Sequence, residues 1–230
     1  MSDVLLVEKS DGVAVWRLNL AEKRNPLSAE VKKALAAAAA DFRQDPALRV
    51  AVLTGNGVAF CAGGDLRSMD TDSGPVATRE RLAETHAVIE SLVGTGKPLI
   101  TAVNGIAAGA GVALAALGDI IVASDRATFT SGFPKVGVMP DCGIMYTLPR
   151  LIGMARAKDF LMTVRRYDAA EAERIGLVSR VIPEADFESE VMKIARGIAE
   201  GPGVSIGLTK EIMNAAVNDT WATFLLREST

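Results

Sequence analysis

Three stretches of the sequence repeat one pattern, a short apolar run that ends in a turn of small or polar residues. They are RVAVLTGNG, PLITAVNGI and DIIVASDRA, at residues 49–57, 98–106 and 119–127. Continuous apolar runs of this length are typical of strands that are buried on both faces of a sheet. Helical patterns lie between the first two runs, at residues 79–93, and after the second, at residues 111–117. This alternation predicts an α/β fold with mostly parallel strands.

The two ends of the chain carry different patterns. Residues 4–8 and 13–18 alternate as short strands around the turn Ser-Asp-Gly, which predicts a hairpin. An Ala-rich helix with Ser28 as its N-cap is expected next. From residue 154 the sequence is mainly helical, with VSRVIP as a short extended piece. We therefore expect residues 1–153 to form the core and residues 154–230 to form a helical region of the same domain.

The composition excludes several classes of protein. The formal net charge is −3, with no basic footprint for nucleic acid. The single histidine and the two cysteines, Cys61 and Cys142, have no metal-ligand spacing and form no disulfide framework. No signal peptide or membrane-spanning run is expected, so the prediction is a soluble cytoplasmic protein that does not act on membranes.

Two loops rich in small residues follow predicted strands. They are AFCAGGDL at residues 59–66 and NGIAAGAGVALAALGD at residues 104–119. Small residues let a ligand approach the backbone, and one backbone N–H group from each loop could converge on one oxygen as an oxyanion hole. Alternatively, the loops serve only tight turns and close helix packing. A dinucleotide site is disfavoured, because the G-x-G of Gly109 to Gly111 is followed by Leu114 where a third small residue is needed.

Several motifs together resemble the enoyl-CoA hydratase/isomerase (crotonase) superfamily. They are EKRNPLS, FCAGGDL, PLITAVNGIAAGAGVALAALGDIIVAS, FPKVGVMPDCGIMYTLPRLIG and AEAERIGLVSRVI, in an order that covers nearly the whole chain. The resemblance implies a spiral core of repeated ββα units and a C-terminal region that forms trimers or pairs of trimers. It also implies an acyl-CoA thioester as substrate, with no cofactor beyond the coenzyme A that the substrate carries.

The resemblance carries residue roles over to this sequence. The N–H groups of Gly64 and Ala110 would form the oxyanion hole. Ala62, Asp65 and Leu66 would line the path of CoA, and Arg24 would lie near its phosphates. The full set implied for substrate binding is Arg24, Ala62, Gly64, Asp65, Leu66, His86, Gly109, Ala110 and Phe133.

The catalytic carboxylates of the family's hydratases are absent. The resemblance aligns their two glutamates with Ala113 and Phe133, which disfavours hydration of the usual kind. Asp141 instead resembles the proton-shuttling aspartate of the family's isomerases, of the dienoyl-CoA and 1,2-epoxyphenylacetyl-CoA types. The leading hypothesis is double-bond isomerisation of an enoyl-CoA, with Asp141 as the proton shuttle.

Four alternatives stay open at this stage. Asp141 could cap the helix that follows it. The chain could still be an enoyl-CoA hydratase, or a non-catalytic acyl-CoA-binding protein. His86 is either structural or, as in the family's aroyl-CoA dehalogenases, a partner of a nucleophilic aspartate at Asp141; those enzymes use a tryptophan where Phe133 stands.

Overall fold

Two sheets organise the chain in a computed structural model that describes residues 4–65 and 74–229. The larger sheet has the order β1-β2-β3-β5-β7-β10, and the smaller has the order β4-β6-β8-β9. The strands of the larger sheet are β1 (Leu5–Ser10), β2 (Val13–Leu18), β3 (Val50–Gly55), β5 (Leu99–Val103), β7 (Ile120–Ser124) and β10 (Arg180–Ile182). Those of the smaller sheet are β4 (Ala59–Cys61), β6 (Ile106–Ala108), β8 (Thr128–Thr130) and β9 (Arg166–Asp168).

The chain builds these sheets by repeating a ββα unit. In each repeat a strand of the larger sheet leads directly into a strand of the smaller sheet and then into a helix. The first repeat is β3, β4 and α2 (Gly74–Val93), and the second is β5, β6 and α3 (Ala110–Ala115). The third is β7 and β8, followed by η3 (Phe133–Val136) and α4 (Ile144–Ile152). The predicted α/β spiral of ββα units is therefore confirmed.

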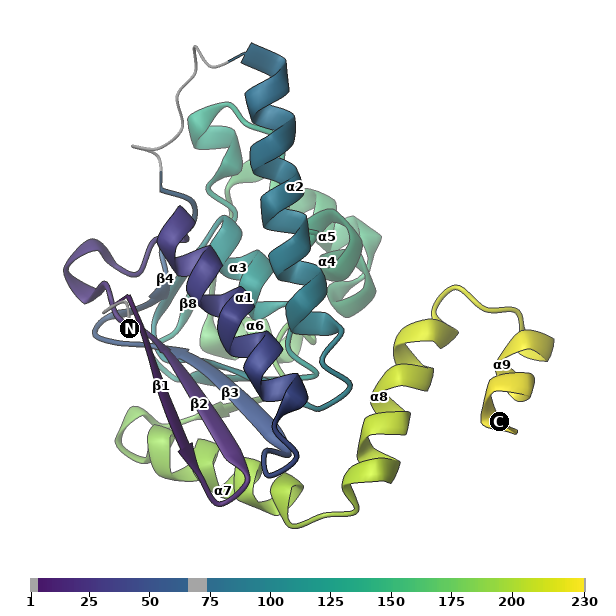
Figure 1. The fold of residues 1–230 in the computed structure, drawn as a ribbon. Helices are drawn as coiled ribbons and strands as arrows, with labels where there is room; N and C mark the ends of the chain where they lie inside the picture. The colour runs from purple at the N-terminus through teal and green to yellow at the C-terminus, as the bar shows by residue number, and fades with distance from the viewer. Residues whose placement is uncertain (1–3, 66–73, 230) are drawn as a thin grey trace.

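The three apolar runs form adjacent parallel strands at the centre of the larger sheet. β3 pairs with β5, and β5 pairs with β7. Every residue of β3 and of β5 is buried. One face of the sheet is covered by α1 (Ala29–Gln44), where Trp16 packs edge-on against Phe42. The other face is covered by α7 (Phe187–Ala199), as Figure 1 shows, which explains why these runs lack a polar side.

The N-terminal predictions are also confirmed. β1 and β2 form an antiparallel hairpin. Ser28 is the N-cap of α1, and its hydroxyl oxygen accepts a hydrogen bond from the N–H of Val31. The cap fixes where α1 begins, close to the segment that later contacts the first glycine-containing loop.

The C-terminal region is mainly helical, with two strands that return to the sheets. Its helices are α5 (Met154–Thr163), α6 (Ala169–Arg174), α7, α8 (Gly203–Ala216) and α9 (Trp221–Glu228). The predicted extended piece is β10, which pairs with β7. β9 was not expected from the sequence, and it pairs antiparallel with β8.

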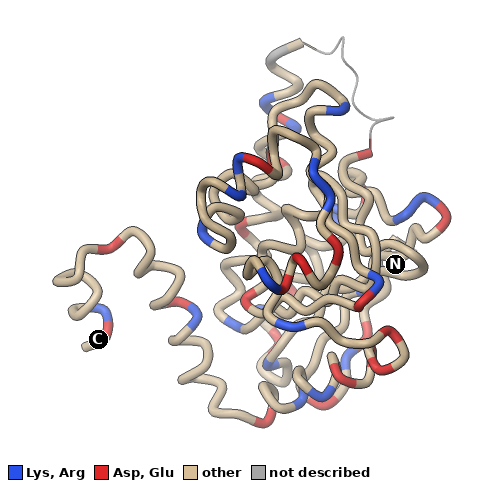
Figure 2. The backbone as a smooth tube through the Cα atoms, turned by 180° about the vertical axis from the view of Figure 1, so that it is seen from behind, with Lys and Arg blue, Asp and Glu red and all other residues tan. Residues whose placement is uncertain are grey.

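The last two helices extend away from the body of the molecule (Figures 1 and 2). Several large apolar side chains of this arm are exposed: Val204, Leu208, Met213, Val217, Trp221, Leu225 and Leu226. Within the described ranges, no helix combines the length and hydropathy needed to cross a bilayer.

Candidate active site

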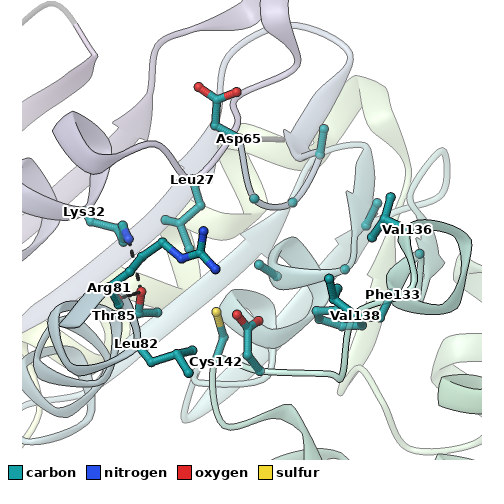
Figure 3. Close-up of a pocket in the computed structure, with 18 of the residues that line it drawn as sticks. Leu27, Lys32, Asp65, Arg81, Leu82, Thr85, Phe133, Val136, Val138 and Cys142 are labelled. Carbon is teal, nitrogen blue, oxygen red and sulfur yellow. Dashed lines mark hydrogen bonds between the residues drawn. The ribbon is translucent and has the colours of Figure 1, made fainter. Parts of the chain in front are cut away.

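A cavity of about 260 Å³ lies where the two glycine-containing loops meet α2 and the segment before α4 (Figure 3). It brings together seven of the residues that the sequence nominated: Ala62, Gly64, Asp65, Gly109, Ala110, Phe133 and Asp141. Its other walls are mostly apolar, formed among others by Leu27, Leu82, Val136 and Val138. Residues from five separate segments of the chain therefore share one concave surface, which is typical of a ligand site.

The first loop is held by the segment that precedes α1. The N–H of Leu27 donates to the carbonyl of Gly63 at 2.8 Å, and the N–H of Ala62 donates to the carbonyl of Arg24 at 2.9 Å. Gly63 has φ of +105°, and a Cβ atom there would lie 2.9 Å from the carbonyl oxygen of Ala108. Only glycine allows this combination of conformation and close approach.

The second loop is held against the first by another glycine. A Cβ atom on Gly111 would lie 2.0 Å from the carbonyl oxygen of Cys61, so α3 begins directly against the end of β4. Gly109 turns the chain with φ of +51°, and its N–H donates to the carbonyl of Thr130. Two loops that are far apart in sequence are thereby held in contact at the edge of the smaller sheet.

Two backbone N–H groups border the cavity without an acceptor in the described part of the chain. They belong to Gly64 and to Ala110, the first residue of α3. The first N–H groups of a helix have no partner within it. Amide groups of this kind can stabilise a negatively charged oxygen without a charged side chain.

Asp141 lies in the loop between η3 and α4 and is half-buried. The N-cap of α4 is Gly143, and no side chain caps this helix. The helix-cap interpretation of Asp141 is therefore wrong; the loop takes two further residues, Cys142 and Gly143, both with positive φ, before the helix begins.

The thiol of Cys142 lines the cavity next to Asp141 in the chain. Burial of this thiol, together with the negative charge of Asp141, raises the pKa of Cys142 far above its ordinary value. The thiol therefore stays protonated at neutral pH, where it can donate a hydrogen bond to the carboxylate but cannot act as a nucleophile.

The structure does not place three of the expected substrate-binding residues in the cavity. Arg24 and His86 are exposed and do not line it. Leu66 lies outside the described residues. Of the positions aligned with hydratase glutamates, Phe133 lines the cavity and Ala113 is buried in α3. Asp65 and Asp141 are thus the two carboxylates that line the cavity among the described residues.

Three cations that were not predicted from the sequence also line the cavity: Lys32, Arg81 and Lys135. Arg81 and Thr85 lie one turn apart on the same face of α2, and Lys32 of α1 donates a hydrogen bond to Thr85. The i, i+4 spacing of Arg81 and Thr85 can be read from the sequence, but the packing of α1 against α2 cannot. Among the described residues no three His, Cys, Asp or Glu side chains gather as a metal site.

Comparisons with known proteins agree with this geometry. The enoyl-CoA hydratase/isomerase family matches residues 8–230. The chain is 34% identical to the 1,2-epoxyphenylacetyl-CoA isomerase of Escherichia coli, over 98% of this chain and 87% of that protein. It is 36% identical to 4-chlorobenzoyl coenzyme A dehalogenase-2 of an Arthrobacter species, over 93% and 79% of the two chains.

The crystal structure of an enoyl-CoA hydratase/isomerase from Cupriavidus metallidurans superposes with a TM-score of 0.94. The sequences are 35% identical, and the match covers 99% of this chain and 86% of that one. The fold and the loops around the cavity thus define an enzyme of the acyl-CoA-processing type. The chain belongs to the enoyl-CoA hydratase/isomerase family.

Proposed function

We propose that this protein moves a double bond within an enoyl-CoA, with Asp141 as the proton shuttle and the N–H groups of Gly64 and Ala110 as the oxyanion hole. The observation that carries the proposal is the meeting of Asp141 with these two N–H groups in one cavity. The family supplies the thioester substrate. No cofactor is required beyond the coenzyme A of the substrate.

The reaction needs one base that becomes an acid. Asp141 removes a proton from C2 of a 3-enoyl-CoA, and the electron pair of the C2–H bond moves toward the thioester oxygen. The resulting dienolate is stabilised by the two N–H groups, where one donor contributes roughly 10²–10³ in rate. Asp141 then returns the proton to C4, and the double bond lies between C2 and C3. Atoms and charge balance without water.

The carboxylates of the cavity favour isomerisation over hydration. Hydration needs one group to activate water and one to deliver a proton. Phe133 and Ala113 stand where the family's hydratases carry their glutamates, so among the described residues only Asp141 and Asp65 bring a carboxylate to the cavity. Asp65 belongs to the loop of Gly64, on the path assigned to CoA.

The experiment follows the conjugated 2-enoyl thioester by its ultraviolet absorbance after a 3-enoyl-CoA is added. The wild-type protein should produce the signal, and Asp141→Asn should lower the rate by about 10²-fold or more. Glu84→Gln, an exposed change outside the cavity, is the matched control and should keep the wild-type rate. Equal rates in wild type and Asp141→Asn would overturn the proposal.

The hydratase, dehalogenase and binding-only alternatives give different results in the same set of assays. A hydratase would consume a 2-enoyl-CoA with loss of absorbance. A dehalogenase would release halide from a halogenated aroyl-CoA; His86 lies outside the cavity and Phe133 replaces the tryptophan, which disfavours this activity. A binding protein would hold the ligands without turnover.

We also propose that the chain assembles as a trimer or as a pair of trimers. The support is the arm of α8 and α9, which exposes several large apolar side chains. Large exposed apolar patches mark surfaces that bind other proteins. Sedimentation equilibrium would measure the mass directly. A monomer at micromolar concentration would contradict this proposal.

A further inference from the structure

The cavity contains a cationic corner that the proposed proton transfer does not use. The guanidinium of Arg81 points into the cavity between Leu27 and Cys142 (Figure 3). Arg81 is half-buried, and no carboxylate in the described part of the chain forms an ion pair with it. A partly desolvated cation without a counter-ion favours the binding of an anion.

Lys32 stands beside Arg81 and is held in place from both helices. Its ammonium donates to the hydroxyl of Thr85 at 3.1 Å, and that hydroxyl donates to the carbonyl of Arg81 at 2.9 Å. Thr85 is buried, so this link is shielded from solvent. The Lys32 ammonium has three donors, and the bond to Thr85 uses one of them. Two charged donor groups from α1 and α2 therefore face the same corner.

The rest of this wall suits a carbon chain. Leu27 and Leu82 flank the cations, and Phe133, Val136 and Val138 line the opposite side. A purely apolar acyl group would offer these two cations no anionic partner. An acyl group that ends in a carboxylate would satisfy them, because a guanidinium presents two parallel N–H groups to the two carboxylate oxygens.

We propose that Arg81 and Lys32 bind a carboxylate at the far end of the acyl group, so that the preferred substrate is the CoA monothioester of a dicarboxylic acid. This inference rests on the proposed function for the acyl-CoA in the cavity. The same cations could instead bind a phosphate of CoA, which is also an anion. The two sources differ in one respect: every CoA ester has the phosphates, and only some have the terminal carboxylate.

The test measures binding, so it does not depend on turnover. Titration calorimetry gives the dissociation constants of two pairs of CoA esters. Adipoyl-CoA is compared with hexanoyl-CoA, and suberoyl-CoA with octanoyl-CoA. Within each pair the acyl chains have the same length, but the first ends in a carboxylate and the second in a methyl group. We expect the wild-type protein to bind the carboxylated member of each pair about tenfold more tightly. Equal affinities within both pairs would overturn the inference.

The variants locate the preference. Arg81→Gln should remove the preference for the carboxylated ligand and leave binding of hexanoyl-CoA unchanged. Arg81→Lys, which keeps the charge without the two parallel donors, should retain part of it. Arg79→Gln, an exposed cation on the same helix outside the cavity, is the control and should retain all of it. If Arg81→Gln weakens free CoA and all four esters by the same factor, the cations bind a phosphate and the inference is wrong.

The outcomes separate this inference from the proposed function. If no assay detects isomerisation but the preference for carboxylated ligands is present, the proposed reaction is wrong and the assignment of Arg81 and Lys32 to a carboxylate stands. If methyl-ended substrates are isomerised and carboxylated ligands bind no more tightly, the proposed reaction stands and the carboxylate inference is wrong.

Discussion

The ammonium group of Lys210 lies 2.9 Å from a carboxylate oxygen of Asp119. Lys210 also donates to the carbonyl of Lys97 at 3.0 Å and to the hydroxyl of Thr95 at 3.3 Å. The other role of Asp119 is to accept the N–H of Leu99, the first residue of β5. This buried cluster joins α8, the first helix of the protruding arm, to the central strand of the larger sheet.

Replacing Lys210 should therefore loosen the arm. Lys210→Ala leaves Asp119 without its cation, and removing one partner of a buried ion pair costs roughly 3–5 kcal/mol. We expect a loss at the lower end of this range, because the side chain of Asp119 is partly exposed to water. Hydrogen exchange of α8 should become faster, and urea unfolding should shift to lower concentration. Lys193→Ala removes an exposed i, i+3 pair and is the control, with little change expected. Unchanged exchange in α8 would show that the cluster does not anchor the arm.

Asn25 should be one of the most sensitive positions near the site. Its side chain accepts the N–H of Leu20 at 2.8 Å and donates to the carbonyls of Ala59 and Asn56. It is buried, with φ of +54°. Asn25→Ala removes three hydrogen bonds and leaves buried polar groups unpaired, so unfolding free energy should fall by about 2–4 kcal/mol. Asn218→Ala, an exposed amide, should change it by much less; equal effects in chemical denaturation would contradict this account.

Gly64 and Gly111 should respond in opposite ways to alanine. A Cβ on Gly64 meets nothing within 4 Å, so Gly64→Ala should fold with nearly wild-type stability while its methyl group intrudes on the cavity and lowers turnover. A Cβ on Gly111 would collide with the carbonyl oxygen of Cys61, so Gly111→Ala should lower stability as well as activity. Thermal unfolding measured beside turnover distinguishes the two. A stable, fully active Gly111→Ala protein would refute the close approach of α3 to β4.

The stability of the protein should fall in alkaline solution. Burial raises the pKa of the Cys61 thiol from 9.0 to about 11. Because the unfolded chain loses this proton first, the contribution to stability is complete below pH 9 and is lost as the pH rises through about 11. Urea unfolding across this range should give a falling free energy. Cys61→Ala keeps the Cβ atom and should show a shallower fall; identical slopes would contradict the assignment to Cys61.

Much of the fold was predictable because its strands are buried on both faces. The runs that form β3, β5 and β7 are continuously apolar, which indicates burial on both faces. Ser28, a favoured N-cap residue, indicates where α1 begins. β9 could not be found in this way. Its residues, Arg-Tyr-Asp at 166–168, contain no apolar run, and the strand exists because it pairs with β8.

In the candidate site, too, features with a local cause in the sequence were predictable, and features that depend on long-range packing were not. The glycines of both loops were visible because their spacing after strands has a local cause. Whether Asp141 caps α4 depended on where the helix begins, and the positive φ of Cys142 and Gly143 moves that start beyond its reach. Arg81 and Lys32 were missed because each is an ordinary charged residue on its own helix. Only the packing of α1 against α2 makes them neighbours.

The two N–H groups that border the cavity, those of Gly64 and Ala110, belong to the main chain. Substitution by alanine therefore leaves both donors in place, since every residue except proline carries the same amide. Side chains around the cavity can be exchanged over evolutionary time while these donors persist, provided that Gly63 and Gly111 keep the two loops in contact. New acyl-CoA specificities can accordingly arise by changes on the helices and in the segment near Asp141, without rebuilding the part of the site that the backbone supplies.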